Sequence, residues 1–271
     1  MPELPEVETL VRGLRPDVTG RMITGFESTW PRQIAGMDSL AFADRIYGQR
    51  VERLWRRAKY LVFDLSSDVL LVHLKMSGRL YVTPQGQPRP DDRWVRAIFL
   101  FDDGSDLRFS DLRKFGRLYL VGNMESITAQ IGPEPLDESF TPALFAAALT
   151  GRARSIKPLL MDQSVIAGVG NIYADEALWR AQIDPRRAAN TLSSMDVERL
   201  YHAVRGALND GIDHEGSSIN WYRKADGGTG EHQNHFNAYG QQGRPCGRCG
   251  GPIHKIWLGQ RGTHFCPVCQ V

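Results

Sequence analysis

The chain has 271 residues, with 33 Lys and Arg against 31 Asp and Glu, so its formal net charge is only +2. An apolar content of 42% beside 24% charged residues excludes a largely disordered chain, and the length is typical of one or two domains. No apolar run approaches the roughly 20 residues of a membrane span, and the first residues lack the features of a signal peptide, so we expect a cytoplasmic protein.

The basic residues gather in three clusters, although the total charge is nearly balanced. Such clusters are typical of a solvated surface, or of a protein that presents positive charge to nucleic acid on one face. They are Arg53, Arg56, Arg57 and Lys59; Arg113, Lys114 and Arg117; and Arg152, Arg154 and Lys157.

The first predicted element is a short amphipathic helix near the N-terminus. Pro5 suits the first turn of a helix, where its missing N–H costs nothing, and Pro16 is expected to end it. One apolar stripe at helical spacing consists of Val7, Leu10, Val11 and Leu14.

Residues from about 20 to 122 are predicted to form β-structure. Short apolar runs alternate there with turn signals such as Ser66-Ser67-Asp68, which is typical of a sandwich or a barrel. The predicted strands are Lys59–Leu65, Val69–Lys75, Val95–Phe101, Asp106–Phe109 and Arg117–Val121.

After a predicted linker at 132–140, the apolar period becomes helical. Thr141 can cap a helix at Pro142–Thr150, and further helices are expected at Asn171–Ala181 and Asp196–Asp210. The polar, glycine-rich stretch 217–236 is expected to be a mobile loop.

These elements predict an α+β fold with three parts. A β-rich N-terminal part with a short first helix comes first, and a helical domain and a small Cys-rich module follow the linker. The expected boundaries are 1–131, then 141–236 including the loop 217–236, then 237–271.

All four cysteines lie in the last 26 residues, in the pattern Cys246-x2-Cys249-x16-Cys266-x2-Cys269. Two such pairs can complete a tetrahedral shell around zinc, and four thiolates leave no position for a reactive water. We therefore predict one structural Zn²⁺, whose binding supplies folding energy to the module. Four independent thiols or a redox pair are the alternatives.

Five motifs, spread from one end of the chain to the other, resemble those of the formamidopyrimidine-DNA glycosylase family, which includes endonuclease VIII. Leu4 favours the purine-repair branch, because endonuclease VIII relatives typically have Gly there. The motifs are Pro2-Glu3-Leu4-Pro5-Glu6-Val7-Glu8, His73-Leu74-Lys75-Met76-Ser77-Gly78, Asp111-Leu112-Arg113-Lys114-Phe115-Gly116, Gly168-Val169-Gly170-Asn171-Ile172-Tyr173-Ala174 and Gln260-Arg261-Gly262-Thr263-His264-Phe265-Cys266-Pro267.

This resemblance implies a β-sandwich, a helix–two-turn–helix domain and a zinc-finger hairpin. It also implies a bifunctional enzyme that acts on double-stranded DNA. Such an enzyme removes oxidised purines, such as 8-oxoguanine and formamidopyrimidines, and then cuts the strand by β,δ-elimination.

The resemblance places the chemistry on five residues. Pro2, freed by removal of Met1, would be the nucleophile, because an α-amino group has a pKa near 8 and is partly neutral at pH 7. Glu3 would be the general acid and base, and Glu6 a second carboxylate, although it also suits the helix dipole. Lys59 and Arg261 would hold phosphates and assist the β- and δ-eliminations, and a surface position is the alternative for both. Glu176 matches a further family residue more weakly.

The same resemblance implies a set of DNA contacts. Met76, Arg113 and Phe115 would fill the gap that the flipped base leaves, with Arg113 facing the orphaned cytosine. Asn171, where a glycine-rich turn meets a helix, would bind phosphate, or else simply cap the helix. The remaining expected contacts are His73, which could instead be a core histidine, and Arg154 and Lys157.

Two departures from the family pattern bear on a DNA contact and on lesion preference, respectively. Asp91-Asp92-Arg93-Trp94 replaces a His-containing motif, which leaves Arg93 as a substitute contact, and Asn220-Trp221 replaces an Arg-centred pair in the loop. An endonuclease VIII-like enzyme for oxidised pyrimidines and a non-catalytic binder of damaged DNA remain alternatives. The absence of an assembly motif favours a monomer.

Overall fold

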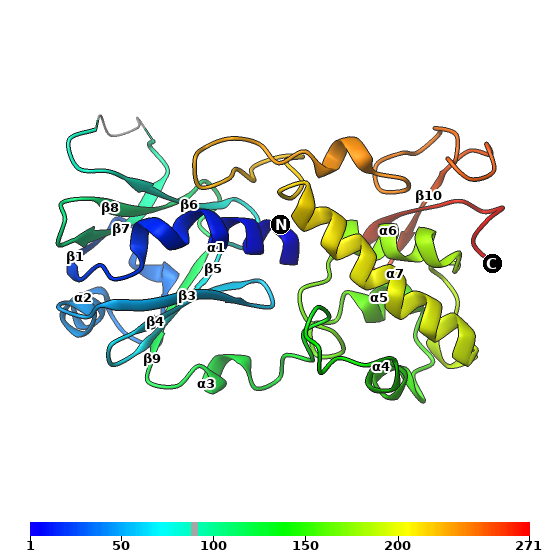
Figure 1. The fold of residues 1–271 in the computed structure, drawn as a ribbon, viewed down its shortest axis with the longest axis horizontal. Coiled ribbons are helices and arrows are strands. Elements are labelled where there is room, and N and C mark those ends of the chain that lie inside the picture. Colours follow the sequence, from blue (N-terminus) through cyan, green and yellow to red (C-terminus); the bar gives the residue numbers. More distant parts are fainter. Residues whose placement is uncertain (88–91) are drawn as a thin grey trace. The chain divides into compact units, whose positions relative to one another are not determined.

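The computed structural model describes residues 1–87 and 92–271, which divide into two compact units. The first unit comprises Met1–Ala129 and Glu215–Glu231, and the second comprises Gln130–His214 and His232–Val271. Figure 1 shows the strands of the first unit in blue to green and the helices of the second in green to yellow. Within the described ranges, no helix is both long and apolar enough to cross a membrane.

The first unit consists of two β-sheets that share one hydrophobic core. One sheet has the strand order β1-β7-β8-β6 and the other the order β2-β9-β5-β4-β3. Phe99 and Phe109 of the first sheet and Phe63 and Val72 of the second belong to the same buried cluster, which confirms the predicted sandwich. The strands are β1 (Ile23–Ser28), β2 (Ile34–Ala35), β3 (Val51–Arg57), β4 (Tyr60–Leu65), β5 (Val69–His73), β6 (Gly78–Thr83), β7 (Val95–Phe101), β8 (Asp106–Asp111) and β9 (Arg117–Val121).

Helix α1 (Leu4–Val18) joins the two sheets, because it contacts β3 and β4 of one and β6 of the other. Its predicted apolar stripe is buried in their common core. The expectation that Pro16 ends the helix is wrong, since α1 continues to the buried Val18. Proline removes one hydrogen bond, to the carbonyl four residues earlier, and Arg12 there is exposed to water, which can replace the lost donor.

One short helix interrupts the region of the first unit that was expected to be all β, and another lies just beyond that region. In α2 (Ser39–Ile46), Asp38 caps the first turn by accepting hydrogen bonds from the N–H groups of Leu40 and Ala41. Its inward face carries little more than Phe42 and Ile46, which is too short a pattern to predict a helix. The other helix is α3 (Glu125–Thr128), and a 3-10 turn, η1, spans Pro31–Gln33.

The second unit contains the predicted helices. Helix α6 has the predicted bounds, α4 begins at Pro142 with Thr141 as its cap, and α7 begins before the predicted start because Ser193 and Asp196 cap each other reciprocally. The helices are α4 (Pro142–Leu149), α5 (Ile156–Leu160), α6 (Asn171–Ala181) and α7 (Ser194–Asp213), with 3-10 turns η2 (Ala189–Thr191) and η3 (His232–His235), and the hairpin strands are β10 (His254–Leu258) and β11 (Arg261–Phe265).

The glycine-rich loop expected at 217–236 groups largely with the first unit, whereas the sequence assigns it to the helical domain. Tyr222 explains this grouping, because its side chain is buried in the core of the first unit and its hydroxyl donates to the carbonyl oxygen of Glu215. A bridge between Ser217 and Glu231 closes the segment at its base. We call Glu215–Glu231 the lid segment below.

A buried ion pair connects the helices of the second unit to its hairpin. Lys157 on α5 is fully buried, and its Nζ lies 2.7 Å from Asp175 Oδ1 on α6. The same Nζ donates to the carbonyl oxygen of Gly262 at 3.0 Å and to Thr263 Oγ1 at 2.8 Å. Asp175 Oδ2 accepts the backbone N–H of His264 at 2.9 Å. The ammonium therefore positions the hairpin in the free protein, and the expected contact of Lys157 with DNA phosphate stays a prediction.

Replacing Lys157 should destabilise the second unit. Lys157→Met leaves the Asp175 carboxylate buried without its cation, so we expect a loss of about 3–5 kcal/mol in the free energy of unfolding, measured by denaturant titration. Lys255→Met removes an exposed lysine from the same hairpin and should change it by less than about 0.5 kcal/mol. Equal losses in the two variants would contradict the role of the buried pair.

Candidate active site and DNA interface

The N-terminal residues of the first unit are held in place by a buried carboxylate. Pro2 is buried, and Glu3 and Glu6 are 3% and 1% exposed. Glu6 Oε2 accepts the backbone N–H of Glu3 at 2.7 Å, and Oε1 accepts that of Ser217 at 2.8 Å. Glu6 therefore acts as a positioning residue that connects the start of the chain to the base of the lid segment, while Met1 remains half exposed.

Lys59 and His73 are also brought together within the first unit. Lys59 follows Ala58, whose left-handed φ of 51° makes the tight turn between β3 and β4, and the side chain of Lys59 is almost fully buried. His73 lies on β5, opposite Tyr60 in the neighbouring strand. Burial, together with the charges of Lys75 and Lys59, lowers the pKa of His73 to about 3.

His73 is consequently neutral over the physiological pH range. Its Nδ1 accepts the backbone N–H of Lys75 at 3.0 Å, which places the ring proton on Nε2, where it can be donated to an anion. The pKa of Lys75 is itself lowered, by burial and by the charge of Arg117. Sequence reasoning missed Lys75, although it stands inside the motif that named His73.

Met76, Arg113 and Phe115 form one exposed group. Met76 and Phe115 are 43% and 47% exposed, so neither is the core residue that an isolated reading would suggest. The guanidinium carbon of Arg113 lies 4.7 Å from the centre of the Phe115 ring, and one of its nitrogens lies 2.9 Å from the sulfur of Met76. The structure thus brings the expected trio together on the surface of the first unit.

Asp111 holds the backbone on which this trio stands. Its carboxylate accepts hydrogen bonds from the hydroxyl of Ser77 at 2.5 Å and from the N–H groups of Arg113 and Gly116 at 3.2 and 2.7 Å. A Cβ at Gly116 would lie 2.2 Å from the ring of Phe109, so the turn requires glycine. Asp111 was not singled out as a site residue, because its role depends on a loop from elsewhere in the chain.

Arg93 lies on a different part of the first unit. Its guanidinium carbon stacks 4.5 Å from the ring centre of Trp94, at the wall of a cavity of about 850 Å³. Of the departure at 91–94, Asp91 lies outside the described residues.

In the second unit, the hairpin of β10 and β11 presents Arg261. Gly259 and Gln260 form its two-residue turn, both with positive φ, as a type I′ turn requires. Arg261 and Arg154 line one small cavity of about 250 Å³, together with Pro158, Met161, Asp162, Leu258 and Gly259. Arg154 is exposed and lies 3.4 Å from Asp162, so two guanidinium groups gather at one place on this unit.

Asn171 and Glu176, both on α6, are engaged in internal contacts. Asn171 Nδ2 donates to the carbonyl oxygen of Gly262 at 3.1 Å, and Gly170 rather than Asn171 is the helix cap. Glu176 accepts the N–H groups of Asn237, Ala238 and Tyr239 within 3.0 Å. Its pKa is raised by burial, which outweighs these hydrogen bonds, so Glu176 positions residues 237–239.

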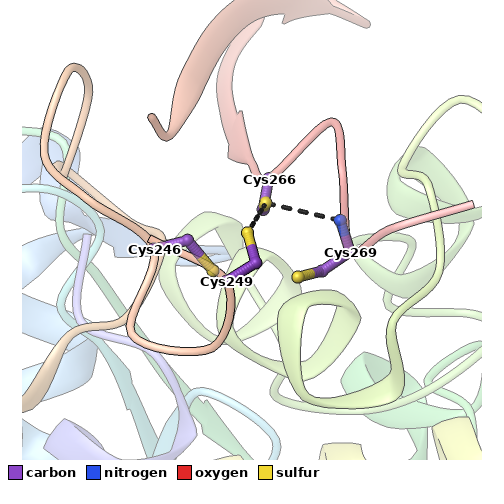
Figure 2. A group of neighbouring side chains, drawn as sticks. All are labelled: Cys246, Cys249, Cys266 and Cys269. Carbon is purple, nitrogen blue, oxygen red and sulfur yellow. Dashed lines mark hydrogen bonds between the residues drawn. The ribbon is translucent and has the colours of Figure 1, made fainter. Parts of the chain in front are cut away.

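The four cysteines form the predicted metal site of the second unit. Their sulfur atoms lie within 4.8 Å of one another and form no disulfide, as Figure 2 shows. Sulfur ligands of a tetrahedral zinc ion are separated by about 3.8 Å, and the sulfurs of Cys249 and Cys266 lie 3.5 Å apart. The indole N–H of Trp179 donates to Cys246 Sγ and the backbone N–H of Cys269 to Cys266 Sγ, as suits thiolates. The site therefore fits one structural Zn²⁺ held by four thiolates.

Removal of zinc should unfold the Cys module. We expect one zinc per chain by elemental analysis and no rapid reaction of the cysteines with a thiol reagent, because the metal protects all four sulfurs. After chelation, all four thiols should react and a protease should cut within 237–271. Rapid modification of the thiols before chelation would contradict a zinc site.

Comparison with known proteins identifies the same three parts. Residues 1–118 match the formamidopyrimidine-DNA glycosylase N-terminal domain, residues 131–223 match its H2TH domain, and residues 243–271 match the zinc finger found in FPG and IleRS. Each part agrees with the structure, including the cluster of four cysteines.

Whole-chain comparisons extend this likeness. The chain is 45% identical to the formamidopyrimidine-DNA glycosylase of Herpetosiphon aurantiacus and 43% identical to that of Geobacillus kaustophilus, with 100% of each chain covered. Among solved structures, it resembles Lactococcus lactis Fpg in complex with DNA that contains Fapy-dG (TM-score 0.90, 37% identity). It also resembles that protein with abasic-site DNA (TM-score 0.90, 36% identity), and 99% of each chain is covered in both cases. The chain therefore belongs to the formamidopyrimidine-DNA glycosylase family.

Proposed function

We propose that this protein is a bifunctional DNA glycosylase and abasic-site lyase that removes oxidised purines from double-stranded DNA. The relatives are named for the glycosylase activity, and the similar structures hold DNA with a Fapy-dG or an abasic site. The observation that carries the proposal is the buried Pro2-Glu3 end of the chain, held by Glu6 at the start of α1.

The nucleophile in this proposal is the nitrogen of Pro2. It is an amide while Met1 is attached, and Met1 is 51% exposed, so a processing enzyme can reach it. Removal leaves a secondary amine with a pKa near 8. Its lone pair attacks C1′ of the damaged nucleotide, the bond from C1′ to the base breaks, and Glu3 supplies a proton to the departing base or to the ring oxygen.

The Pro2 nitrogen then loses its proton, and its lone pair forms a C=N bond to C1′ as the C1′–O4′ bond breaks and O4′ takes up a proton. The product is a Schiff base in its iminium form, a cation that withdraws electrons from the opened sugar. A proton then leaves C2′ and the 3′ phosphate departs, which is the β-elimination. A second elimination releases the 5′ phosphate. Lys59 and Arg261 supply positive charge to the two departing phosphates, and water finally hydrolyses the iminium and frees Pro2.

DNA recognition in this proposal uses the remaining groups. Neutral His73 donates from Nε2 to a phosphate, and Arg154 adds a second guanidinium beside Arg261. Met76 and Phe115 enter the stack where the damaged base leaves it, and Arg113 donates to the acceptors of the orphaned cytosine. Lys157 contributes by positioning the hairpin.

Borohydride trapping tests the nucleophile. With the Met1-free chain, whose N-terminus is verified by intact mass, a duplex that contains 8-oxoguanine should yield a covalent protein–DNA adduct. Pro2→Gly leaves a primary amine without the buried ring that positions it, so the yield should fall by about a hundredfold or more. Pro5→Ala, in the first turn of α1, should keep the adduct.

Three outcomes of this experiment would contradict the proposal. An adduct that Pro2→Gly does not reduce would remove Pro2 as the nucleophile. A preference for thymine glycol over 8-oxoguanine would indicate an enzyme for oxidised pyrimidines. No adduct with any lesion would indicate a non-catalytic binder.

Arg113 should determine the choice of the opposite base. Arg113→Ala removes the donors for cytosine, so the ratio of excision rates opposite cytosine and opposite adenine should fall about tenfold, measured in single-turnover assays. Lys114→Asn removes a neighbouring charge at a position with left-handed φ, which Asn tolerates, and should leave the ratio unchanged. An unaltered ratio in Arg113→Ala would remove this assignment.

A further inference from the structure

The cavity of about 850 Å³ in the first unit has walls from three segments. Arg79 and Tyr81 come from β6, Arg93 and Trp94 from the residues that lead into β7, and Trp221 from the lid segment. Its volume lies in the range of small-molecule sites. Of the described residues, none that we assign to the chemistry lines it, which leaves the cavity without a role in the proposed reaction.

Two guanidinium groups lie at this cavity and form no ion pair within the ranges that the structure describes, although Asp92 is close enough to Arg79 for their charges to interact. Arg79 Nε is buried and has no hydrogen-bond partner among the residues that the structure describes. Arg93 is exposed, lies against the face of Trp94, and forms no ion pair within the described ranges. A buried N–H without a partner is unfavourable, so a ligand with acceptor oxygens would gain affinity here.

The acidic residues of the same cavity accept their hydrogen bonds from other donors. Asp92 accepts the hydroxyl of Tyr81 at 3.0 Å and the backbone N–H of Trp94 at 2.9 Å. Asp226 accepts the backbone N–H of Gly228 at 2.8 Å. Because both carboxylates are committed to neighbouring donors, the groups left for a ligand are mainly cationic.

Aromatic surface completes the cavity. The indole of Trp221 is 47% exposed although it lines the wall, so one side of it is open to a flat ligand. Tyr81 also lines the cavity and is almost fully buried, and the ring of Trp94 stacks against the guanidinium of Arg93. Aromatic surface beside guanidiniums that form no ion pair is a combination that binds unpaired nucleotides, by stacking of the base and pairing of the phosphate.

We propose that this cavity is a second binding site of the protein, and that it takes a nucleotide. The base stacks on Trp221, and Arg79 and Arg93 bind the phosphate. The nucleotide can be free or can belong to an unpaired stretch of a DNA strand, since both present the same base and phosphate. The proposal does not depend on the glycosylase reaction.

The test is a titration of the full-length, zinc-loaded protein with deoxyguanosine monophosphate, followed by calorimetry and by the indole N–H signals in nuclear magnetic resonance spectra. The signals of Trp94 and Trp221, assigned from variants, should shift. That of Trp257, which is 74% exposed on β10, should stay in place. Deoxyguanosine without phosphate should bind at least about tenfold more weakly, because it leaves both guanidiniums unpaired.

Variants locate the site. Arg79→Gln and Trp221→Ala should each weaken binding about tenfold, whereas Trp257→Ala should not, and thermal unfolding verifies that all three fold.

A single-stranded trinucleotide that binds at least tenfold more tightly than the monophosphate would identify a DNA strand as the source, and equal affinity would identify the free nucleotide. Absence of binding by both ligands would overturn the proposal, as would binding that neither Arg79→Gln nor Trp221→Ala weakens.

Discussion

The buried carboxylate of Glu6 is the contact on which the arrangement of the first unit depends. A carboxylate at this burial is tolerable only when hydrogen bonds satisfy its oxygens, and two backbone N–H groups do so, one from Glu3 and one from Ser217. These two donors are more than 200 residues apart in the chain. One side chain thus holds both the N-terminal residues and the base of the lid segment, and in the proposed reaction it aligns the nucleophile with its acid.

The second unit depends in the same way on polar groups that are buried and paired. Lys157, Asp175 and the backbone of β11 form one network of ion-pair and hydrogen-bond contacts. The cluster of four cysteines flanks the hairpin in the sequence and brings the segments before and after it together. Neither α5, with five residues, nor the hairpin is long enough to be stable alone. The contacts between α5 and the hairpin, together with the bound zinc, therefore determine the position of Arg261. In the free protein, Lys157, for which the family resemblance predicts a DNA contact, positions the hairpin.

Three basic side chains of the first unit are buried or partly buried, where the dielectric constant is lower than in water. Lys59, His73 and Lys75 lie close enough for their charges to interact, and burial adds to the effect, so His73 is neutral and Lys75 has a lowered pKa. Such a cluster is costly in the free protein and is relieved when an anion binds. A DNA phosphate would provide that relief, and a similar argument applies to Arg79, whose buried Nε has no hydrogen-bond partner among the described residues.

The sequence by itself determined those features that depend on local pattern. The stripe of α1, the bounds of α6, the alternation of the strands and the spacing of the four cysteines were all predictable, because each is set by neighbours a few residues away. Only the tertiary structure decided the features that depend on distant partners. It continued α1 past Pro16, placed the lid segment with the first unit, buried Lys157 against Asp175 and left Met76 and Phe115 exposed. The physical reason is that the burial of a side chain, and the partner that compensates it, depend on segments far apart in the chain, which no local pattern encodes.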